Sequence, residues 1–380
     1  MKVTFLNRLM LIASLLTSSH IFAYDLEIDG IYYTVDISNF TCAVTSKDNN
    51  YNSYSGDIII PEAITYKTRT LKVTSIDYGA FYNCTNLKSV TIGSSIKNIG
   101  EKAFCGCNSL ISIKIPNSVT RIENYAFDGC SSLKELTIED GAETLSLGKC
   151  IYSYTYEGWT SSYTRGLFYL CPIEIVHLGR NLDCDFPPFH DNLTNDGTAN
   201  IKKVTIGNSV TRVCDYAFDG CSGLTSITLG RTIENIGQYA FTRCPSITTI
   251  NSYNPIPPIG AEFAKNIYMD AIVNIPIGSL SSYQTANGWK NFWDIVEVEN
   301  IENTDAAVHS ISHTEDIKVS AIHQTINIKG IESNTPIYIY GTSGDLLYNN
   351  TATENNISIK LYQTGVYIVK VSGKTFKVIL

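Results

Sequence analysis

A motif that recurs at a fixed interval constrains this chain more than any other feature of its 380 residues. The copy at 126–133 reads Ala-Phe-Asp-Gly-Cys-Ser-Ser-Leu, and its cysteine marks the register of the repeat. Cys84, Cys107 and Cys130 follow one another at intervals of 23 residues, and the same interval separates Cys221 from Cys244. A fixed period in the range of about 20–50 residues is the signature of a solenoid built from stacked coils.

The repeat predicts one short strand in every coil, centred on an apolar residue. From one strand centre to the next the interval is 23 residues, except for steps of 32 at the start, 40 after Leu136 and 28 after Val176. The frame therefore survives insertions of 17 and 5 residues in the middle of the array. The nine predicted strand centres are Ile58, Val90, Ile113, Leu136, Val176, Val204, Ile227, Ile250 and Val273.

Each coil is expected to bury the apolar face of its strand. Leu133, Leu136 and Ile138 would point inward, and the polar residues between them would point outward. Ala126 and Phe127 would close the coil. No coil holds the dozen periodic residues of a true helix. The predicted fold class is therefore mainly β, with short strands, turns or 3₁₀ pieces on the back of the solenoid and little helix.

The cysteines at the repeat position are expected to be free thiols, although the chain holds eleven cysteines. Stacked coils place equivalent residues about 4.8 Å apart with parallel side chains, whereas a disulfide needs Cβ atoms about 3.8 Å apart. We predict small buried side chains there, and no metal site, because the ligand spacing is missing. The repeat position holds Cys84, Cys107, Cys130, Cys171, Cys221 and Cys244, and the roles of Cys42, Cys150, Cys184 and Cys214 stay open.

The two ends of the array are expected to be covered, since a bare coil exposes core and strand edge. Residues 24–56 form the candidate N-terminal cap, with two strands around the turn at Asp29 and Gly30. The solenoid itself is expected at 57–299. At its end Ser279 suits the N-cap of a short helix. The aromatic residues expected to cover the last coil are Trp289, Phe292 and Trp293.

Outside the solenoid, the sequence predicts three further segments. Residues 1–23 read as a secretory signal peptide, with Lys2 and Arg8 before an apolar run that is too short to span a bilayer. Residues 300–316 are polar and acidic, which is typical of a linker. Residues 317–380 alternate like six or seven short strands and predict a small β-sandwich.

The repeat residues carry a family resemblance. The pattern Ala-Phe-x-x-Cys-x-x-Leu-x-x-Ile-x-Ile-Pro-x-Ser-Val-x-x-Ile resembles the BspA-type, or Treponema-type, leucine-rich repeat. That resemblance implies a solenoid with adhesin-like roles, which include binding host extracellular proteins or other bacteria. Residues 317–380 resemble the C-terminal sorting domain of type IX secretion cargo, on the motifs Gly-Asp-Leu-Leu-Tyr at 344–348 and Gly-Val-Tyr-Ile-Val-Lys-Val at 365–371. This second resemblance implies a partner in the type IX machinery and a gram-negative surface or secreted protein.

The larger insertion is the candidate binding element. Loops inserted into a rigid scaffold are where binding groups concentrate, and aromatic residues favour interfaces. A hairpin whose aromatic side chains pack back on its own coil is the alternative. Within 149–165 the candidate binding residues are Tyr152, Tyr154, Tyr156, Trp159 and Tyr163.

No other motif indicates chemistry. The net charge of −8 argues against nucleic acid, which needs a basic surface. His309 and His313 lack the glutamate of a zinc-protease helix, and His177 is expected at an outward strand position. Asp183, Asp185 and Asp191 are more simply a solvated acidic loop than a cation site.

We therefore expect an interaction protein, not an enzyme, with no cofactor. The expected partner is a host or bacterial surface macromolecule, a protein or a glycan. A glycan-binding module at the insertion is one alternative. A glycan-directed enzyme is a weaker alternative, because Glu157 is the single carboxylate among the aromatic residues of the insertion and hydrolysis normally needs two.

Overall fold

The structure is a computed structural model that describes residues 24–48, 51–156, 159–184, 186–189, 200–298 and most of 317–379. In the last range the gaps are 323–324, 330, 332, 334, 342–344, 355, 362–364 and 372–373. Contacts divide the chain into two compact units, with the division between Ile301 and Glu302. The predicted signal peptide at 1–23 and linker at 300–316 lie outside the described residues.

The first unit begins with a three-stranded antiparallel cap of β1 (Leu26–Ile28), β2 (Ile31–Asp36) and β3 (Thr41–Thr45). Asp29 and Gly30 have φ values of 51° and 76°, as a two-residue hairpin turn requires. This confirms the predicted strands. Strand β3 then pairs in parallel with β6 (Arg69–Ile76), which joins the cap to the solenoid. A hairpin of β5 (Ala63–Tyr66) and β6 lengthens the first coil and was not predicted.

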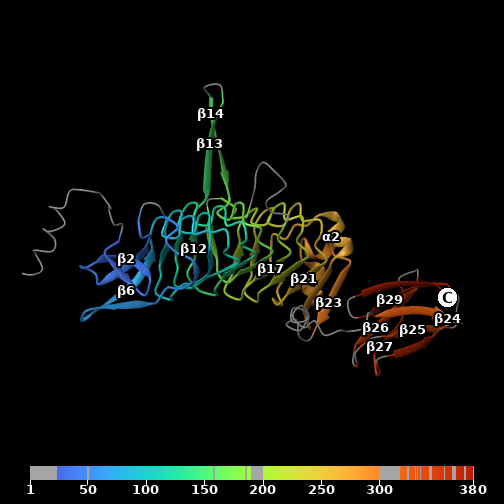
Figure 1. Ribbon diagram of the computed structural model, residues 1–380. Coiled ribbons are helices and arrows are strands. Elements are labelled where there is room, and N and C mark those ends of the chain that lie inside the picture. Colours follow the sequence, from blue (N-terminus) through green and yellow to red (C-terminus); the bar gives the residue numbers. More distant parts are fainter. Residues whose placement is uncertain are drawn as a thin grey trace, which may run out of the picture. The chain divides into compact units, whose positions relative to one another are not determined.

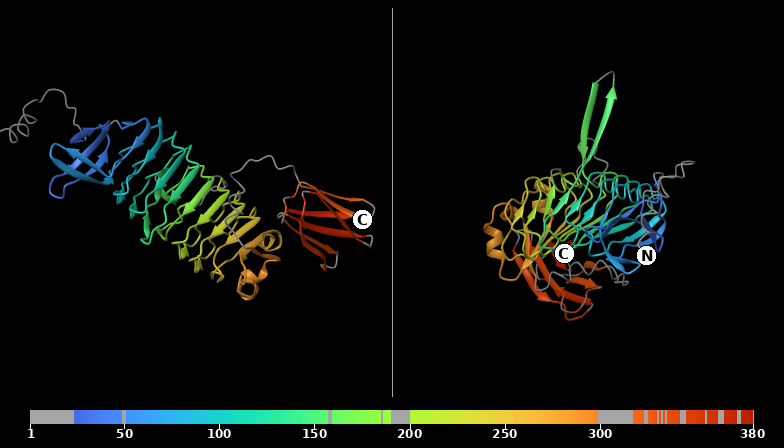
Figure 2. Two further views of the ribbon diagram at one scale, coloured as in Figure 1. Left: turned by 90° about the horizontal axis from the view of Figure 1, so that it is seen from below. Right: turned by 90° about the vertical axis from the view of Figure 1, so that its left-hand side faces the viewer.

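The front of the solenoid is a parallel sheet whose register follows the predicted frame (Figure 2). Leu136 pairs with Val176 across the larger insertion, and Val176 pairs with Val204 across the smaller one. One further strand, centred on Ile295, was not predicted. The sheet contains β9 (Ser112–Ile115), β11 (Glu135–Ile138), β15 (Ile175–Leu178), β17 (Lys203–Ile206), β19 (Ser226–Leu229), β21 (Thr249–Ser252), β22 (Ile272–Pro276) and β23 (Asp294–Val298), while β4 (Gly56–Ile59) and β7 (Leu87–Thr91) pair with each other ahead of it.

The back of the solenoid consists of much shorter parallel strands separated by turns. No described coil between β7 and β21 holds a helix, which confirms the predicted fold class. The first four of these strands continue the sheet of the N-terminal cap. The back strands are β8 (Asn98–Ile99), β10 (Arg121–Ile122), β12 (Leu145–Leu147), β16 (Leu182–Cys184), β18 (Arg212–Val213) and β20 (Asn235–Ile236).

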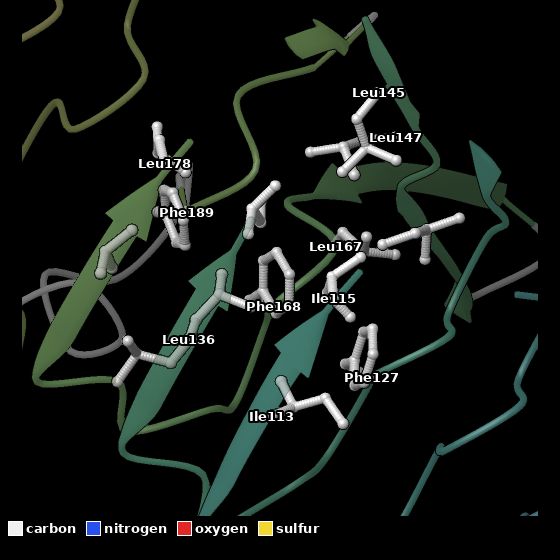
Figure 3. Packing of buried hydrophobic residues seen from close by; sticks show 14 of the residues in the cluster. Ile113, Ile115, Phe127, Leu136, Leu145, Leu147, Leu167, Phe168, Leu178 and Phe189 are labelled. Atoms are coloured by element: carbon white, nitrogen blue, oxygen red, sulfur yellow. The ribbon is translucent and has the colours of Figure 1, made fainter. Parts of the chain in front are cut away.

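One phenylalanine from each coil forms a continuous ladder through the core. Neighbouring rings are nearly parallel, with centroids 4.9 Å apart at the start and 6.0 Å apart at the end. Phe168 and Phe189 carry the ladder across both insertions, as Figure 3 shows beside Phe127. The stacked rings therefore keep the coils in register where the sequence period breaks. The ladder runs through Phe81, Phe104, Phe127, Phe168, Phe189, Phe218, Phe241 and Phe263.

The repeat cysteines form a second ladder next to the first. All six are buried free thiols, as predicted. The Sγ of Cys107 lies 3.1 Å from the Phe81 carbonyl oxygen, and the Sγ of Cys130 lies 3.1 Å from that of Phe104. Each of these two thiols thus donates a hydrogen bond to a carbonyl of the preceding coil. Burial raises the pKa of Cys84 to about 11, so the thiol stays protonated and unreactive near neutral pH.

We expect Cys107→Ala to lower the free energy of unfolding by about 1–2 kcal/mol, because it leaves a small cavity in the core and removes the thiol hydrogen bond to the Phe81 carbonyl. Urea titration of the purified chain would measure this cost. Mass spectrometry of the non-reduced protein should find no bridge among Cys84, Cys107 and Cys130. A bridge between any two of them would contradict the ladder of free thiols.

The solenoid closes with α2 (Lys265–Asp270), α3 (Leu280–Thr285), the 3₁₀ turn η1 (Trp289–Asn291) and strand β23. Trp289 is fully buried and donates from its indole Nε1 to the Pro258 carbonyl at 2.7 Å, and Phe292 is buried beside it. Trp293 was expected to cover the core, but its side chain is 75% exposed. Its backbone amide donates to the Tyr268 carbonyl, so the strand that begins here turns this side chain outward.

Ser279 occupies the N-cap position of α3, as predicted, but its side chain makes no capping hydrogen bond. The Leu280 amide instead donates to Glu297 Oε1 at 2.9 Å, so a carboxylate on β23 satisfies the helix start. The side chain that caps α3 is therefore that of Glu297, and not that of the neighbouring Ser279.

The second unit consists of two antiparallel sheets around one apolar core. Buried residues of both sheets, including Ile328 and Val369, belong to the same cluster. No helix in the described residues is long and apolar enough to cross a membrane. The strands are β24 (Lys318–Ile322), β25 (Thr325–Lys329) and β28 (Asn356–Lys360) in one sheet, and β27 (Leu346–Thr351), β26 (Pro336–Gly341), β29 (Val366–Val371) and β30 (Lys374–Ile379) in the other.

Candidate interaction site on the β13–β14 hairpin

The larger insertion forms an antiparallel hairpin of β13 (Cys150–Tyr156) and β14 (Trp159–Arg165). Figure 1 shows it projecting from the solenoid between the coils that carry β12 and β17. Among the described residues the two strands pair only with each other. The insertion therefore stands out from the solenoid as an arm.

The base of the hairpin is fixed by a tyrosine of the preceding coil. The Tyr125 hydroxyl accepts a hydrogen bond from the Ile151 amide at 3.0 Å and donates one to the Ile151 carbonyl. The Tyr125 hydroxyl thus bonds the two backbone groups of Ile151 that a neighbouring strand would otherwise bond. The Lys149 amide donates to Asn124 Oδ1 at 2.9 Å, and Cys150 is fully buried.

An aromatic cluster packs against this base. The Tyr152 ring lies 5.4 Å from Tyr163, 5.5 Å from Tyr169 and 6.0 Å from Tyr125. The Arg165 guanidinium sits 4.5 Å from the Tyr163 ring centroid and 5.3 Å from that of Tyr169. Cation–π contacts of a desolvated arginine contribute about 2 kcal/mol, so the cluster adds to the rigidity of the base.

A half-buried carboxyl group, that of Asp128, lies beside the Tyr152 hydroxyl. Burial raises the pKa of Asp128. Burial also raises the pKa of the Tyr152 hydroxyl, and the adjacent Asp128 carboxyl raises it further. The phenol therefore stays neutral and holds its ring at the base of the arm.

The register of the hairpin places the candidate binding residues on one face. Tyr152 pairs with Tyr163, Tyr154 with Ser161 and Tyr156 with Trp159. Since side chains alternate along a strand, all of these positions share a face. The opposite face carries the exposed Ile151 together with the hydroxyl residues Ser153, Thr160 and Ser162.

The structure accounts for two of the five candidate binding residues. Tyr152 and Tyr163 are half-buried in the basal cluster, so packing on the coil accounts for them. The side chains of Tyr154, Tyr156 and Trp159, and the whole of Glu157, lie outside the described residues. Their role in binding stays a prediction.

The basal anchors were missed by sequence reasoning. Tyr125, Tyr169 and Arg165 belong to the regular coils or to the edge of the insertion, so nothing in the period marks them. The backbone does not set Tyr125 apart either, because its φ of 58° recurs at the equivalent positions of other coils, such as Lys102 and Tyr239.

The other candidate groups do not assemble into a site in the described part of the chain. His177 is half-buried, and its Nε2 lies 3.2 Å from Asp140 Oδ1 in a surface contact. Asp185, Asp191, His309 and His313 lie outside the described residues. Among the residues that the structure covers, no group of three or more His, Cys, Asp or Glu side chains could hold a metal ion.

Comparisons with known proteins agree with the repeat. The pattern of the BspA type leucine rich repeat region matches residues 61–158 and 194–286 in six copies, which together make up half of the chain. No curated protein matches the chain. The first matched range ends at residue 158, between β13 and β14, and the second begins at residue 194, between β16 and β17.

Similarity to solved structures is weak over the whole chain. A leucine rich repeat protein of T. pallidum is 21% identical, and the match covers 59% of this chain and 90% of that one with a TM-score of 0.41. A leucine rich cell surface protein of Faecalibacterium prausnitzii A2-165 is 20% identical over 71% of this chain and 72% of that one, with a TM-score of 0.40. With the repeat matched over half of its length and stacked in register, the chain belongs to the family of BspA-type leucine-rich repeat proteins.

Proposed function

We propose that this protein is an adhesin-like interaction protein of the bacterial surface or of the secreted fraction, and that the β13–β14 hairpin contacts its partner. The observation that carries this proposal is the rigid attachment of a projecting arm. A clamped base lets the arm meet a partner without a large entropic cost of ordering, which favours affinity.

The residue types of the arm favour a protein partner. Its strands consist largely of tyrosine, serine and threonine, with one tryptophan. Tyrosine and tryptophan give large contact area at low conformational cost, and small hydroxyl residues adapt their hydrogen bonds. The same composition is typical of surfaces that recognise folded proteins.

A glycan is the second candidate partner of the same arm, because the register gathers its aromatic positions on one face. Exposed aromatic rings there would stack on sugar rings. Glycan hydrolysis is disfavoured, since Glu157 is the single carboxylate within 149–165 and the reaction normally needs a pair.

The proposed location rests on the predicted signal peptide at 1–23 and on the resemblance of residues 317–380 to a type IX sorting domain. The signal would direct the chain across the inner membrane, and the second unit would engage the type IX machinery. The chain would then reach the surface of a gram-negative bacterium or the medium.

The proposed role of the arm in partner binding can be tested by capturing surface proteins on the immobilised chain. We expect Tyr154→Ala combined with Trp159→Ala to weaken partner binding about tenfold or more, because such residues are frequent hot spots. The thermal midpoint should stay within a few degrees of the native value, as for exposed loop contacts. A chain that lacks residues 149–165 should lose the partner altogether.

The matched control is Tyr66→Ala, which removes a tyrosine that is 42% exposed on the β5–β6 hairpin. It should leave both binding and stability unchanged. A large loss of stability with unchanged binding in the Tyr154 and Trp159 variant would instead mean that the arm is self-packed, and the proposal would fail.

A further inference from the structure

Strand β13 has an outer edge that faces away from β14. Ile151 fixes the direction of this edge, because its amide and its carbonyl both bond to the Tyr125 hydroxyl and not to β14. Hydrogen-bonded and non-hydrogen-bonded pairs alternate along an antiparallel ladder. The backbone groups of Ser153 and Thr155 therefore point to the same side as those of Ile151.

These outward backbone groups meet no further strand. Among the residues that the structure covers, β13 and β14 pair only with each other, and Ser153 is exposed. Figure 1 shows the arm projecting from the coils. The β5–β6 hairpin differs, since β6 pairs also with β3 and β8. Because an isolated two-stranded hairpin is only marginally stable in water, a third strand on β13 would stabilise the outer part of the arm.

The outer edge of β13 also lacks the features that keep exposed strands from pairing. Natural edge strands commonly carry lysine, proline or a bulge. Strand β13 reads Cys-Ile-Tyr-Ser-Tyr-Thr-Tyr, without proline, glycine or charge, and its register with β14 is unbroken. Aromatic and β-branched residues, which favour strands, make up most of it. The edge is therefore suited to pairing with a second polypeptide.

We propose that the outer edge of β13 binds an extended segment of the partner protein by strand addition, and that Ser153 and Thr155 are the residues that pair. Each of these residues offers one N–H and one C=O, and the two residues lie about 6.8 Å apart along the strand. An extended polypeptide presents the complementary groups at the same interval. A polysaccharide has no amides in its backbone, so these groups select a polypeptide.

The clamp at the base sets where the added strand lies. Tyr125 already holds both backbone groups of Ile151, so the added strand pairs beyond this residue, toward the tip of the arm. In strand addition the main-chain hydrogen bonds give affinity, and alternate side chains give specificity. Half of the side chains of the segment would lie on the face that carries the tyrosine positions of β13, and the others beside Ser153.

This inference rests on the proposed function and deepens it, because it assigns the way in which the arm binds and favours a protein over a glycan. It predicts that binding depends on backbone groups of β13. The side chains of Tyr154 and Trp159 make a separate contribution, so the two can be tested by different substitutions.

The test is fluorescence anisotropy of two labelled peptides with the full mature chain. One peptide has the sequence of residues 159–165, which pairs with β13 on its inner edge, and the other alternates threonine and valine. We expect the native chain to bind at least one of them. Copies of each peptide with N-methyl groups on two adjacent central residues lose a donor on both edges but keep their side chains. They should bind about tenfold more weakly or worse.

Substitutions in the protein locate the edge that binds. Ser153→Pro combined with Thr155→Pro removes the two outward N–H groups and should weaken peptide binding about tenfold or more. Proline is tolerated at edge positions whose N–H faces solvent, so the hairpin should persist. Ser153→Ala should keep binding, because the backbone is unchanged. The matched control is Ser162→Pro, which makes the same change on the outer edge of β14 and should also keep binding.

Four results would overturn the inference. They are no binding of either peptide by the native chain, equal binding of the N-methylated peptides, equal binding by the proline pair, and loss of binding in Ser162→Pro alone. Light scattering after size exclusion adds a further check. A native dimer that the proline pair dissociates would mean that a second copy takes the edge, which also contradicts a partner segment. Failure of the proposed function looks different, because partner capture would then survive deletion of residues 149–165.

Discussion

Phe127→Ala is expected to lower the free energy of unfolding of the solenoid by about 3–5 kcal/mol, the range for truncating a buried phenylalanine. The Phe127 ring is fully buried between Phe104 at 5.3 Å and Phe168 at 5.4 Å, as Figure 3 shows for the latter. Its removal leaves a cavity next to the coil that anchors the hairpin. Neighbouring coils cannot close that cavity without breaking their shared register.

Urea unfolding followed by circular dichroism would measure this effect. Phe127→Leu should cost less, because it keeps most of the buried apolar volume. Phe40→Ala is the matched control, since that ring is 43% exposed in the cap and should change stability by less than about 1 kcal/mol. If Phe127→Ala were no more costly than Phe40→Ala, the ladder would not be a main source of stability.

Much of the fold follows from the sequence because one apolar residue per coil must reach the same core. That requirement predicted the pairing of Leu136 with Val176 across an insertion, and the structure confirms it. The strand around Ile295 was missed, because the closing helices take the place of a repeat motif ahead of it. Period alone identifies strands only where the residues between them also repeat.

Two side chains show where sequence reasoning stops. Phe189 lies in an irregular proline-rich segment, yet it fills the ladder position between Phe168 and Phe218. Arg180 is fully buried, and its guanidinium donates to the carbonyls of Pro116 and Asn117 at 2.9 and 2.8 Å. These contacts reach a coil more than 60 residues earlier, so no local pattern marks them.

The candidate site was only partly predictable, because its contacts also join residues of different coils. Its composition singled out residues 149–165, because aromatic residues are dense there. Which of these residues pack on the coil depends on where the hairpin leaves it. At the base the Tyr152 ring contacts the rings of Tyr125, Tyr163 and Tyr169, and only the structure brings these four together.

Deletion of residues 317–380 is expected to abolish delivery of the protein outside the cell while leaving a folded solenoid. Each unit has an apolar core of its own, and the core of the solenoid includes the buried Tyr283, Trp289 and Phe292 at its last coils. The truncated chain should therefore keep a thermal midpoint within a few degrees of that of the solenoid in the full chain. Loss of export with retained folding would assign the second unit to transport.

Fractionation of both forms in a type IX-competent bacterium would measure this effect. The full chain should appear at the cell surface or in the medium, with or without removal of the second unit, whereas the truncated form should accumulate in the periplasm. A second variant disrupts only the apolar core of the second unit. Ile328→Asp places a charge at a fully buried position of β25 and should also block delivery, because an unpaired buried charge unfolds a small domain. Delivery of the truncated form at native levels would show that the unit is not a sorting signal. The two sheets around Ile328 and Val369 would then belong to the binding surface, and their deletion should weaken partner capture instead.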